Sequence, residues 1–159
     1  MENLFIQIAL QHWKSYNTRT IKLLEGMSEQ QFNAVLTLNG NTPSWLLGHL
    51  AETHDSLFPL LGLGDLMYPE LKEMYLHNHQ SPLKTPFDKE ELTEAWKNIY
   101  KQLDATFSIY SPEQWLEKHT SISEEDFDRE PHRNKFNVLI SRTNHLAYHI
   151  GQIALVYKE

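Results

Sequence analysis

The apolar residues of this chain recur with the period of an α-helix over four long stretches, and this pattern restricts the fold more than any other feature. The stretches cover about residues 2–26, 42–62, 88–110 and 135–157. No segment of useful length alternates apolar and polar residues as a half-buried strand does, and no internal repeat is visible. We therefore predict an all-α four-helix bundle with long crossover connections, which forms a single domain over residues 1–159.

Local signals indicate where the first two helices begin and end. The first helix is expected to end at Gly26 and to bury one apolar side. Four residues are predicted to form that side: Leu4, Ile8, Ile21 and Leu24. Thr42 is a suitable cap for the second helix, because Pro43 fits the first helical position that follows it. Pro59 and Gly62 should end or bend this helix.

The third and fourth helices show the same signals. Asp88 should cap the third helix, which carries the clearest apolar face of the chain. That face consists of Leu92, Ala95, Trp96, Ile99, Leu103, Thr106, Phe107 and Tyr110. The fourth helix has an apolar stripe made of Leu139, Leu146, Ile150, Ile153 and Tyr157. Polar connections are predicted over residues 62–88 and 111–134, with short helices in "YPELKEMYLH" and "SPEQW", and Ser28 should cap another short turn.

The composition excludes several kinds of site and partner. The chain has no cysteine, which removes disulfides, thiolate nucleophiles and cysteine-based zinc sites. A formal net charge of −7 disfavours nucleic acid as a partner. The start, "MENLFIQIAL", lacks the features of a signal peptide, and the most apolar later stretch, "LFPLLGLG", is too short to span a membrane. We therefore expect a cytoplasmic protein with neither a nucleic acid nor a membrane as partner.

The fourth helical stretch contains "RTNHLAYHIGQI", which places two of the nine histidines four positions apart. His145, His149 and Gln152 share one face of a helix, at the edge of its apolar side. An imidazole buried without a hydrogen-bond partner costs about 1–3 kcal/mol, so two of them one turn apart need an explanation. Their spacing suits two nitrogens bound at about 2.0–2.1 Å to one metal ion.

Two common metal motifs do not match this stretch. A zincin needs Glu directly after its first histidine, where this chain has Leu146, and no histidine follows an acidic residue by three positions as in di-iron bundles. The second helix offers His49, which shares its inward side with Thr53 and Leu57. Three histidines with an open coordination position are typical of a catalytic metal centre. The competing interpretation is that the histidines are core or interface residues bonded to their neighbours.

Three polar residues near the candidate ligands are candidates for catalysis. Glu52, three residues after His49, could act as general base or hydrogen-bond acceptor, and a solvated surface residue is the simpler interpretation. Gln152 could bond to a ligand histidine or to a bound water. Arg142, one turn before His145, could meet an anionic substrate or form a surface salt bridge.

The remaining histidines fit a metal site less well. His54 is rotated away from His49 on the helix, whereas His12 could face the bundle near the site. Four others fall in polar connections and are expected to face solvent: His77, His79, His119 and His132. Trp45 and Tyr148 are expected to pack, and either could line a pocket.

The helix order, "TPSWLLGH" in the second helix and "NHLAYHIGQI" in the last resemble the DinB/YfiT-like superfamily of metalloenzymes over nearly the whole chain. The resemblance implies a four-helix bundle in which three histidines hold a divalent metal, usually zinc or nickel. The matching positions are His49, His145 and His149. Homodimers are common in that superfamily.

The resemblance also implies a range of activities on small molecules. Some relatives transfer low-molecular-weight thiols such as bacillithiol or mycothiol, some isomerise maleylpyruvate with a thiol, and some resemble metal-dependent hydrolases. We therefore expect a metal-dependent thiol S-transferase with a thiol cosubstrate. The alternatives are a metal-dependent hydrolase and a non-catalytic bundle that binds a metal or a small ligand.

Overall fold

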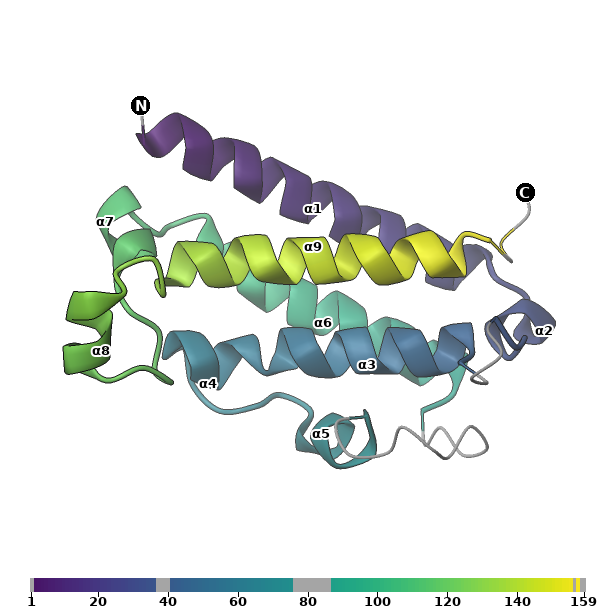
Figure 1. Ribbon diagram of the computed structural model, residues 1–159. Coiled ribbons are helices and arrows are strands. Elements are labelled where there is room, and N and C mark those ends of the chain that lie inside the picture. The colour runs from purple at the N-terminus through teal and green to yellow at the C-terminus, as the bar shows by residue number, and fades with distance from the viewer. Residues whose placement is uncertain (1, 37–40, 76–86, 156, 158–159) are drawn as a thin grey trace.

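The computed structural model describes residues 2–36, 41–75, 87–155 and 157 (Figure 1). In these ranges the chain is helical apart from its connections and one isolated bridge between Lys118 and Asn134. The helices in chain order are α1 (Glu2–Gly26), α2 (Glu29–Phe32), α3 (Pro43–Asp55), α4 (Leu57–Leu61), α5 (Pro69–Tyr75), α6 (Lys89–Phe107), α7 (Pro112–Leu116), α8 (Glu124–Arg129) and α9 (Lys135–Ile153). The predicted all-α class is confirmed.

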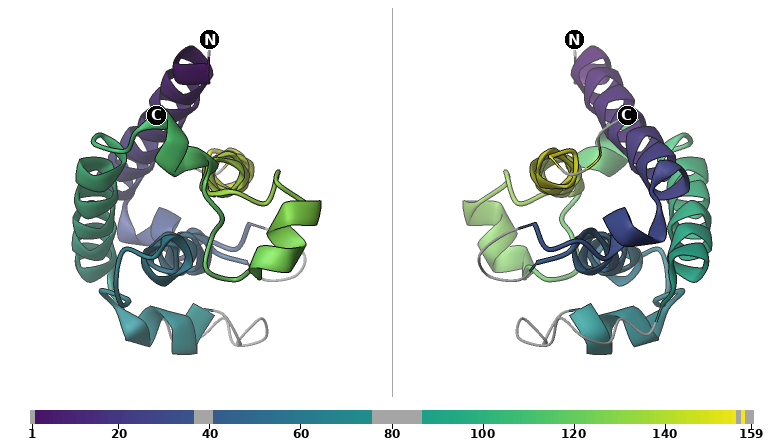
Figure 2. Two further views of the ribbon diagram at one scale, coloured as in Figure 1. Left: turned by 90° about the vertical axis from the view of Figure 1, so that its left-hand side faces the viewer. Right: turned by 90° about the vertical axis from the view of Figure 1, so that its right-hand side faces the viewer.

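Helices α1, α3, α6 and α9 are the long ones, and they pack around a common interior (Figure 2). Contacts join α1 to α9 and α6, and α3 to α6 and α9. Helices α3 and α6 run in one direction and α1 and α9 in the other, so the connection between α3 and α6 must cross the length of the bundle (Figure 1). Helix α5 lies in this connection and packs on α3.

The helix starts are fixed by side-chain caps, as predicted. The side chain of Thr42 accepts a hydrogen bond from the Trp45 N–H at the start of α3. Asp88 caps α6 through the Glu91 N–H, with Oδ1 and N 2.8 Å apart. Ser28 caps α2 in the same way. Each cap satisfies a backbone donor that the first turn of a helix leaves without a partner.

The second helical stretch breaks at Ser56, whereas we predicted a break or bend at Pro59 and Gly62. Pro59 acts four residues before its own position, because it has no N–H to offer to the carbonyl of Asp55. Helix α3 therefore ends at Asp55, and the short helix α4 carries Pro59 in its first turn. Gly62 ends α4 in the left-handed region with φ of 72°.

The predicted buried side of α1 is wrong in its first half. Leu4 is 62% exposed and Ile8 is 43% exposed. The buried stripe instead contains Ile6, Leu10, Trp13, Asn17, Thr20 and Leu24. Two members of this stripe are polar, and their side chains bond to carbonyls of the same helix: Asn17 Nδ2 donates to Trp13 O, and Thr20 Oγ1 donates to Tyr16 O. These polar residues, which donate hydrogen bonds to carbonyls of their own helix, interrupt the apolar pattern on which the prediction was based.

The structure differs from the prediction at the ends of the other two long helices and by one additional helix. Helix α6 ends at Phe107, so Tyr110 lies beyond it, and α9 ends at Ile153. The connection before α9 contains α8, which was not predicted and which Ser123 caps. The apolar stripe of α9 is otherwise as expected, because Leu139, Leu146, Ile150 and Ile153 are all buried.

Candidate metal centre

The site lies where α3 and α9 pack against each other in opposite directions (Figure 1). Leu46 and Leu50 of α3 and Leu146 of α9 are buried in the core cluster that both helices share. His49 lies beside the first pair, and His145 and His149 lie one turn apart on α9. The three imidazoles, called the histidine triad below, are half-buried at this contact.

The Nε2 atoms of the triad converge on one point. His145 Nε2 lies 3.2 Å from His49 Nε2 and 3.0 Å from His149 Nε2. Two nitrogens that bind one ion at about 2.0–2.1 Å in tetrahedral or octahedral positions lie about 2.9–3.4 Å apart. The candidate ligand atoms of the triad all lie within 4.8 Å of one another, so the group has the dimensions of a three-histidine metal site.

Hydrogen bonding among neutral imidazoles does not account for this geometry. A neutral ring has one N–H and one acceptor nitrogen. His149 Nδ1 lies 2.9 Å from Gln152 Oε1, which only accepts, so Nδ1 carries the proton and Nε2 keeps its lone pair. His145 Nε2 can then be a donor or an acceptor, and only one of its two close contacts can be a hydrogen bond. An ion that accepts a lone pair from each ring would satisfy all three.

Gln152 therefore has the contact that we predicted for it. An oxygen acceptor behind a histidine fixes the tautomer and the orientation of the ring, and it raises the basicity of the other nitrogen. The same orientation presents His149 Nε2 to the centre of the triad.

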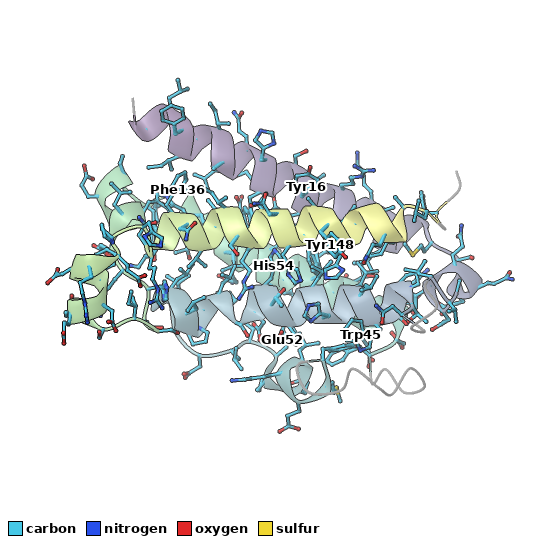
Figure 3. All side chains as sticks on the ribbon, in the orientation of Figure 1. Tyr16, Trp45, Glu52, His54, Phe136 and Tyr148 are labelled. Atoms are coloured by element: carbon cyan, nitrogen blue, oxygen red, sulfur yellow. The ribbon has the colours of Figure 1, made fainter. Side chains whose placement is uncertain are left out.

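Two aromatic side chains flank the triad. Trp45 stacks on His49, with ring centroids 5.4 Å apart and an angle of 9° between the planes. Tyr148 meets the edge of His149 with centroids 5.0 Å apart and is itself 64% exposed. Figure 3 shows Trp45 on α3 and Tyr148 on α9, at the end of the helix contact nearer to the start of α3. Both residues thus pack, as expected, and the rings that they pack on are those of the candidate ligands.

The electrostatics of the triad favour neutral rings. Burial, followed by the nearby charges of His149 and Arg142, lowers the pKa of His145 to about 4. A neutral imidazole has a lone pair to offer to a metal, whereas an imidazolium has none. His145 therefore offers a lone pair to a cation at neutral pH.

Glu52 is buried, at 3% exposed, and our expectation of a solvated residue is wrong. Helix α5 and the chain before it cover this side of α3, where Tyr75 packs against Gly48 one turn away. Glu52 Oε1 accepts a hydrogen bond of 2.8 Å from the Ser56 hydroxyl. Its Oε2 is enclosed and has no hydrogen-bond partner among the described residues.

Arg142 is half-buried and does not form the surface salt bridge that we had considered. Within the described ranges it makes no hydrogen bond or ion pair, and its Nε is enclosed without an acceptor. Burial lowers the pKa of its guanidinium, and the carboxylate of Glu52 partly offsets this effect. Glu52 and Arg142 are thus opposite charges on facing helices, one turn along from the triad, without a direct ion pair.

The other histidines do not join the triad. His54 is buried on α3, where its ring lies 4.9 Å from that of Trp96 in α6 and its Nδ1 lies 2.9 Å from the Leu50 carbonyl (Figure 3). His12 lines a cavity of about 500 Å³ between α1 and α9, on the opposite side of α9, so the expected place near the site is wrong. His132 is exposed as expected, whereas His119 is half-buried. His77 and His79 lie outside the described residues.

The comparisons with known proteins agree with this architecture. The family model of the DinB superfamily matches residues 13–153, a range that contains all three triad histidines. No match was found among curated proteins. None of the described helices is long and apolar enough to cross a membrane. Because the match covers most of the sequence and the bundle has the expected helix order, the chain belongs to the DinB superfamily.

Proposed function

We propose that the protein is a metal-dependent enzyme that binds one divalent transition-metal ion through His49, His145 and His149. The convergence of the three Nε2 atoms, with His149 oriented by Gln152, carries this proposal. Imidazole nitrogens suit zinc and nickel among the common divalent metals. Three protein ligands leave coordination positions for a small molecule, as in catalytic rather than structural sites.

A divalent transition metal lowers the pKa of a bound water or thiol toward neutrality and so supplies a nucleophile. The chain supplies no thiolate of its own, because it has no cysteine. Its residues hold and orient: Gln152 fixes one ring, and Trp45 supports another by stacking. A sulfur ligand suits the softer transition metals.

We favour transfer of a low-molecular-weight thiol, of the bacillithiol type, to an electrophilic small molecule. In this reaction the thiol sulfur forms a bond to carbon and the leaving group departs with its electron pair, while the thiol proton passes to solvent. Hydrolysis by a metal-activated water is the second candidate. The buried carboxylate of Glu52, one turn from His49, favours it because such a group could accept a proton from water.

A thiol-transfer assay with the metal-loaded protein tests the proposal. The protein is incubated with bacillithiol, mycothiol, glutathione or coenzyme A and a chlorinated aromatic acceptor, and conjugate formation is followed. We expect a metal-dependent rate that His149→Ala abolishes, whereas His132→Ala in the exposed connection leaves it unchanged. Hydrolysis of ester substrates without any thiol transfer would favour the second candidate. Metal binding without either activity would favour a binding role.

We further propose that residues 1–159 form one cytoplasmic domain that assembles as a homodimer. The apolar groove between α1 and α9 supports this assembly, because Phe5, Ile8 and Ile140 line it and are at least partly exposed. An exposed apolar patch of this kind is typical of an interaction surface. Sedimentation of the wild type and of Ile8→Glu tests it. A wild type that remains monomeric at high concentration would contradict a dimer.

A further inference from the structure

Arg142 is partly buried, and it lacks the hydrogen-bond partners that usually compensate the burial of a guanidinium. Its five N–H donors meet no acceptor among the described residues, and Nε is fully enclosed. Of its nitrogens only Nε is both enclosed and without a partner, so the Nη atoms keep contact with solvent. The guanidinium therefore has a buried edge and an open edge.

Glu52 supplies a negative charge that partly compensates the burial of Arg142. It is the carboxylate that acts on the charge of Arg142, yet the two groups form no ion pair within 4.0 Å. Glu52 is held in place by the Ser56 hydroxyl and by its own burial. A fixed countercharge near the guanidinium reduces the cost of its burial, and without a direct bond to it the planar fork stays free to bind another acceptor.

Arg142 lies near the candidate ligands along α9. Arg142 precedes His145 by three residues, which corresponds to a rise of about 4.5 Å along α9. The charge of Arg142 lowers the pKa of both His145 and His54, as expected for a guanidinium on the side of α9 that faces α3. Glu52 follows His49 by the same number of residues on α3, which runs in the opposite direction.

The charges of the site call for an anion. The triad rings are neutral ligands, and His54 is kept neutral by burial. A divalent ion and Arg142 together outweigh the single negative charge of Glu52, so the loaded site has a positive net charge in a half-buried place. An Arg fork binds a carboxylate through two parallel hydrogen bonds, and such charge-assisted bonds are about twice as strong as neutral ones.

We propose that the small molecule bound at the triad carries a carboxylate group, and that the open edge of Arg142 binds this group. This inference rests on the proposed function, because it assigns the chemical class of the molecule that meets the metal. A thiol that bears a carboxylate would place its sulfur at the triad and its carboxylate at Arg142. Arg142 is then a specificity-determining residue, and Glu52 is the positioning residue behind it.

Binding to the cobalt(II)-loaded protein, followed by the visible absorption of the metal, tests the inference without turnover. The first pair of probes is 3-mercaptopropionate and its methyl ester, which differ in the negative charge. We expect the wild type to bind the acid at least about tenfold more tightly than the ester. Arg142→Gln should lower this ratio to about 1 while it keeps the affinity for the ester and the cobalt content.

Two further variants guard the result. Arg142→Lys keeps the charge without the planar fork and should retain only part of the preference. Arg133→Gln, which removes an arginine paired with Glu130 in the connection before α9, should behave as wild type. Equal binding of acid and ester by the wild type, or an unchanged preference in Arg142→Gln, would overturn the inference.

A second pair of probes, succinate and succinamate, separates this inference from the thiol reaction. If neither thiol binds but succinate binds at least about tenfold more tightly than succinamate, and Arg142→Gln abolishes this preference, the thiol reaction fails and the carboxylate site stands. If the thiols bind without regard to charge, the carboxylate site fails and the thiol reaction stands. If succinate shows no preference and no thiol binds, both fail.

Discussion

Gln152 is the residue whose role can be isolated most cleanly, because it touches the triad only through His149 Nδ1. Without this acceptor the ring can rotate and can place its proton on Nε2, the atom that faces the triad. Loss of such a hydrogen bond typically costs 10–100-fold in metal affinity.

We therefore predict that Gln152→Ala binds zinc about 10–100-fold more weakly than wild type, as measured by competition with a chromophoric chelator. Gln102→Ala, on the exposed side of α6, is the matched control and should not change the affinity. Equal zinc affinity in the wild type and Gln152→Ala would show that the hydrogen bond does not orient the ring.

His54 gives the protein a defined response to acid. Its pKa is lowered from 6.5 to about 3, chiefly by burial and less by the charges of Arg142 and His145, whereas the hydrogen bond with the Leu50 carbonyl opposes the shift. His54 is therefore protonated below about pH 6.5 in the unfolded chain but only below about pH 3 in the folded chain. The free energy of unfolding is therefore not reduced by His54 above its unfolded-state pKa of 6.5, and it falls as the pH drops from there toward about 3.

Replacement of His54 by Asn keeps a side-chain donor near the Leu50 carbonyl and removes the titration. Between about pH 8 and about pH 5 we expect the metal-free wild type to lose about 2 kcal/mol more than His54→Asn. Urea unfolding of both proteins in the presence of a chelator measures the difference. Parallel pH profiles would mean that His54 is protonated in the folded state at these pH values.

At the scale of the helix, α3 is positioned by a close approach at Gly48. A Cβ atom built on Gly48 would overlap the ring of Tyr75 in α5, whereas one built on Gly151 in α9 meets nothing within 4 Å. The two glycines are both helical, so they differ only in their surroundings. Gly48 keeps α5 against the face of α3 that also carries Glu52.

We predict that Gly48→Ala destabilises the protein by about 1–3 kcal/mol, because the ring of Tyr75 must move. Gly151→Ala should instead stabilise it by roughly 0.5–1 kcal/mol through its better helix propensity. Chemical unfolding of the metal-free variants tests both signs. A neutral Gly48→Ala would show that α5 can shift without cost.

The starts of α3 and α6 were predictable because capping residues next to each helix determine where it begins. Thr42 and Asp88 have caps that need no tertiary information. The face of α1 and the burial of Glu52 were not predictable in this way. Asn17 looks polar until its bond to its own helix is known, and Glu52 looks exposed until α5 is placed over it.

The triad was predictable in part. The spacing of His145 and His149 follows from helix geometry alone. Their meeting with His49 required α3 and α9 to pack in a given register, and neither helix specifies that register by itself. The resemblance to a known superfamily implied it, and the family model spans both helices. The placement of the opposite charges of Arg142 and Glu52 depends on the same register and has no signal in either helix.

At the scale of the whole molecule, the core is large enough to fold without an ion. Buried aromatic side chains from several elements fill it, among them Trp13, Trp96, Trp115 and Phe107. The triad lies at the edge of this core and is half-buried. A bound ion therefore adds stability by mass action and does not create the fold.

We expect chelation to lower the melting temperature by about 5–15 °C, the effect of an ion present at 100 to 1,000 times its dissociation constant. Far-UV circular dichroism at room temperature should remain helical after the ion is removed. Differential scanning calorimetry with and without chelator measures the shift. Loss of helical structure on mild chelation at room temperature would assign the ion a structural role.

The cap of α9 makes the protein unequally tolerant of insertions and deletions. Asn134 begins the helix through a 2.9 Å bond from the Asn137 N–H, and from there each residue turns the helix by about 100°. One residue gained between this cap and His145 would swing both histidines of α9 away from His49, with the core stripe displaced by the same angle. The same gain in the exposed connection before Asn134 would be absorbed by the loop. Related sequences should therefore vary in length ahead of Asn134 and keep a constant count from there to the triad.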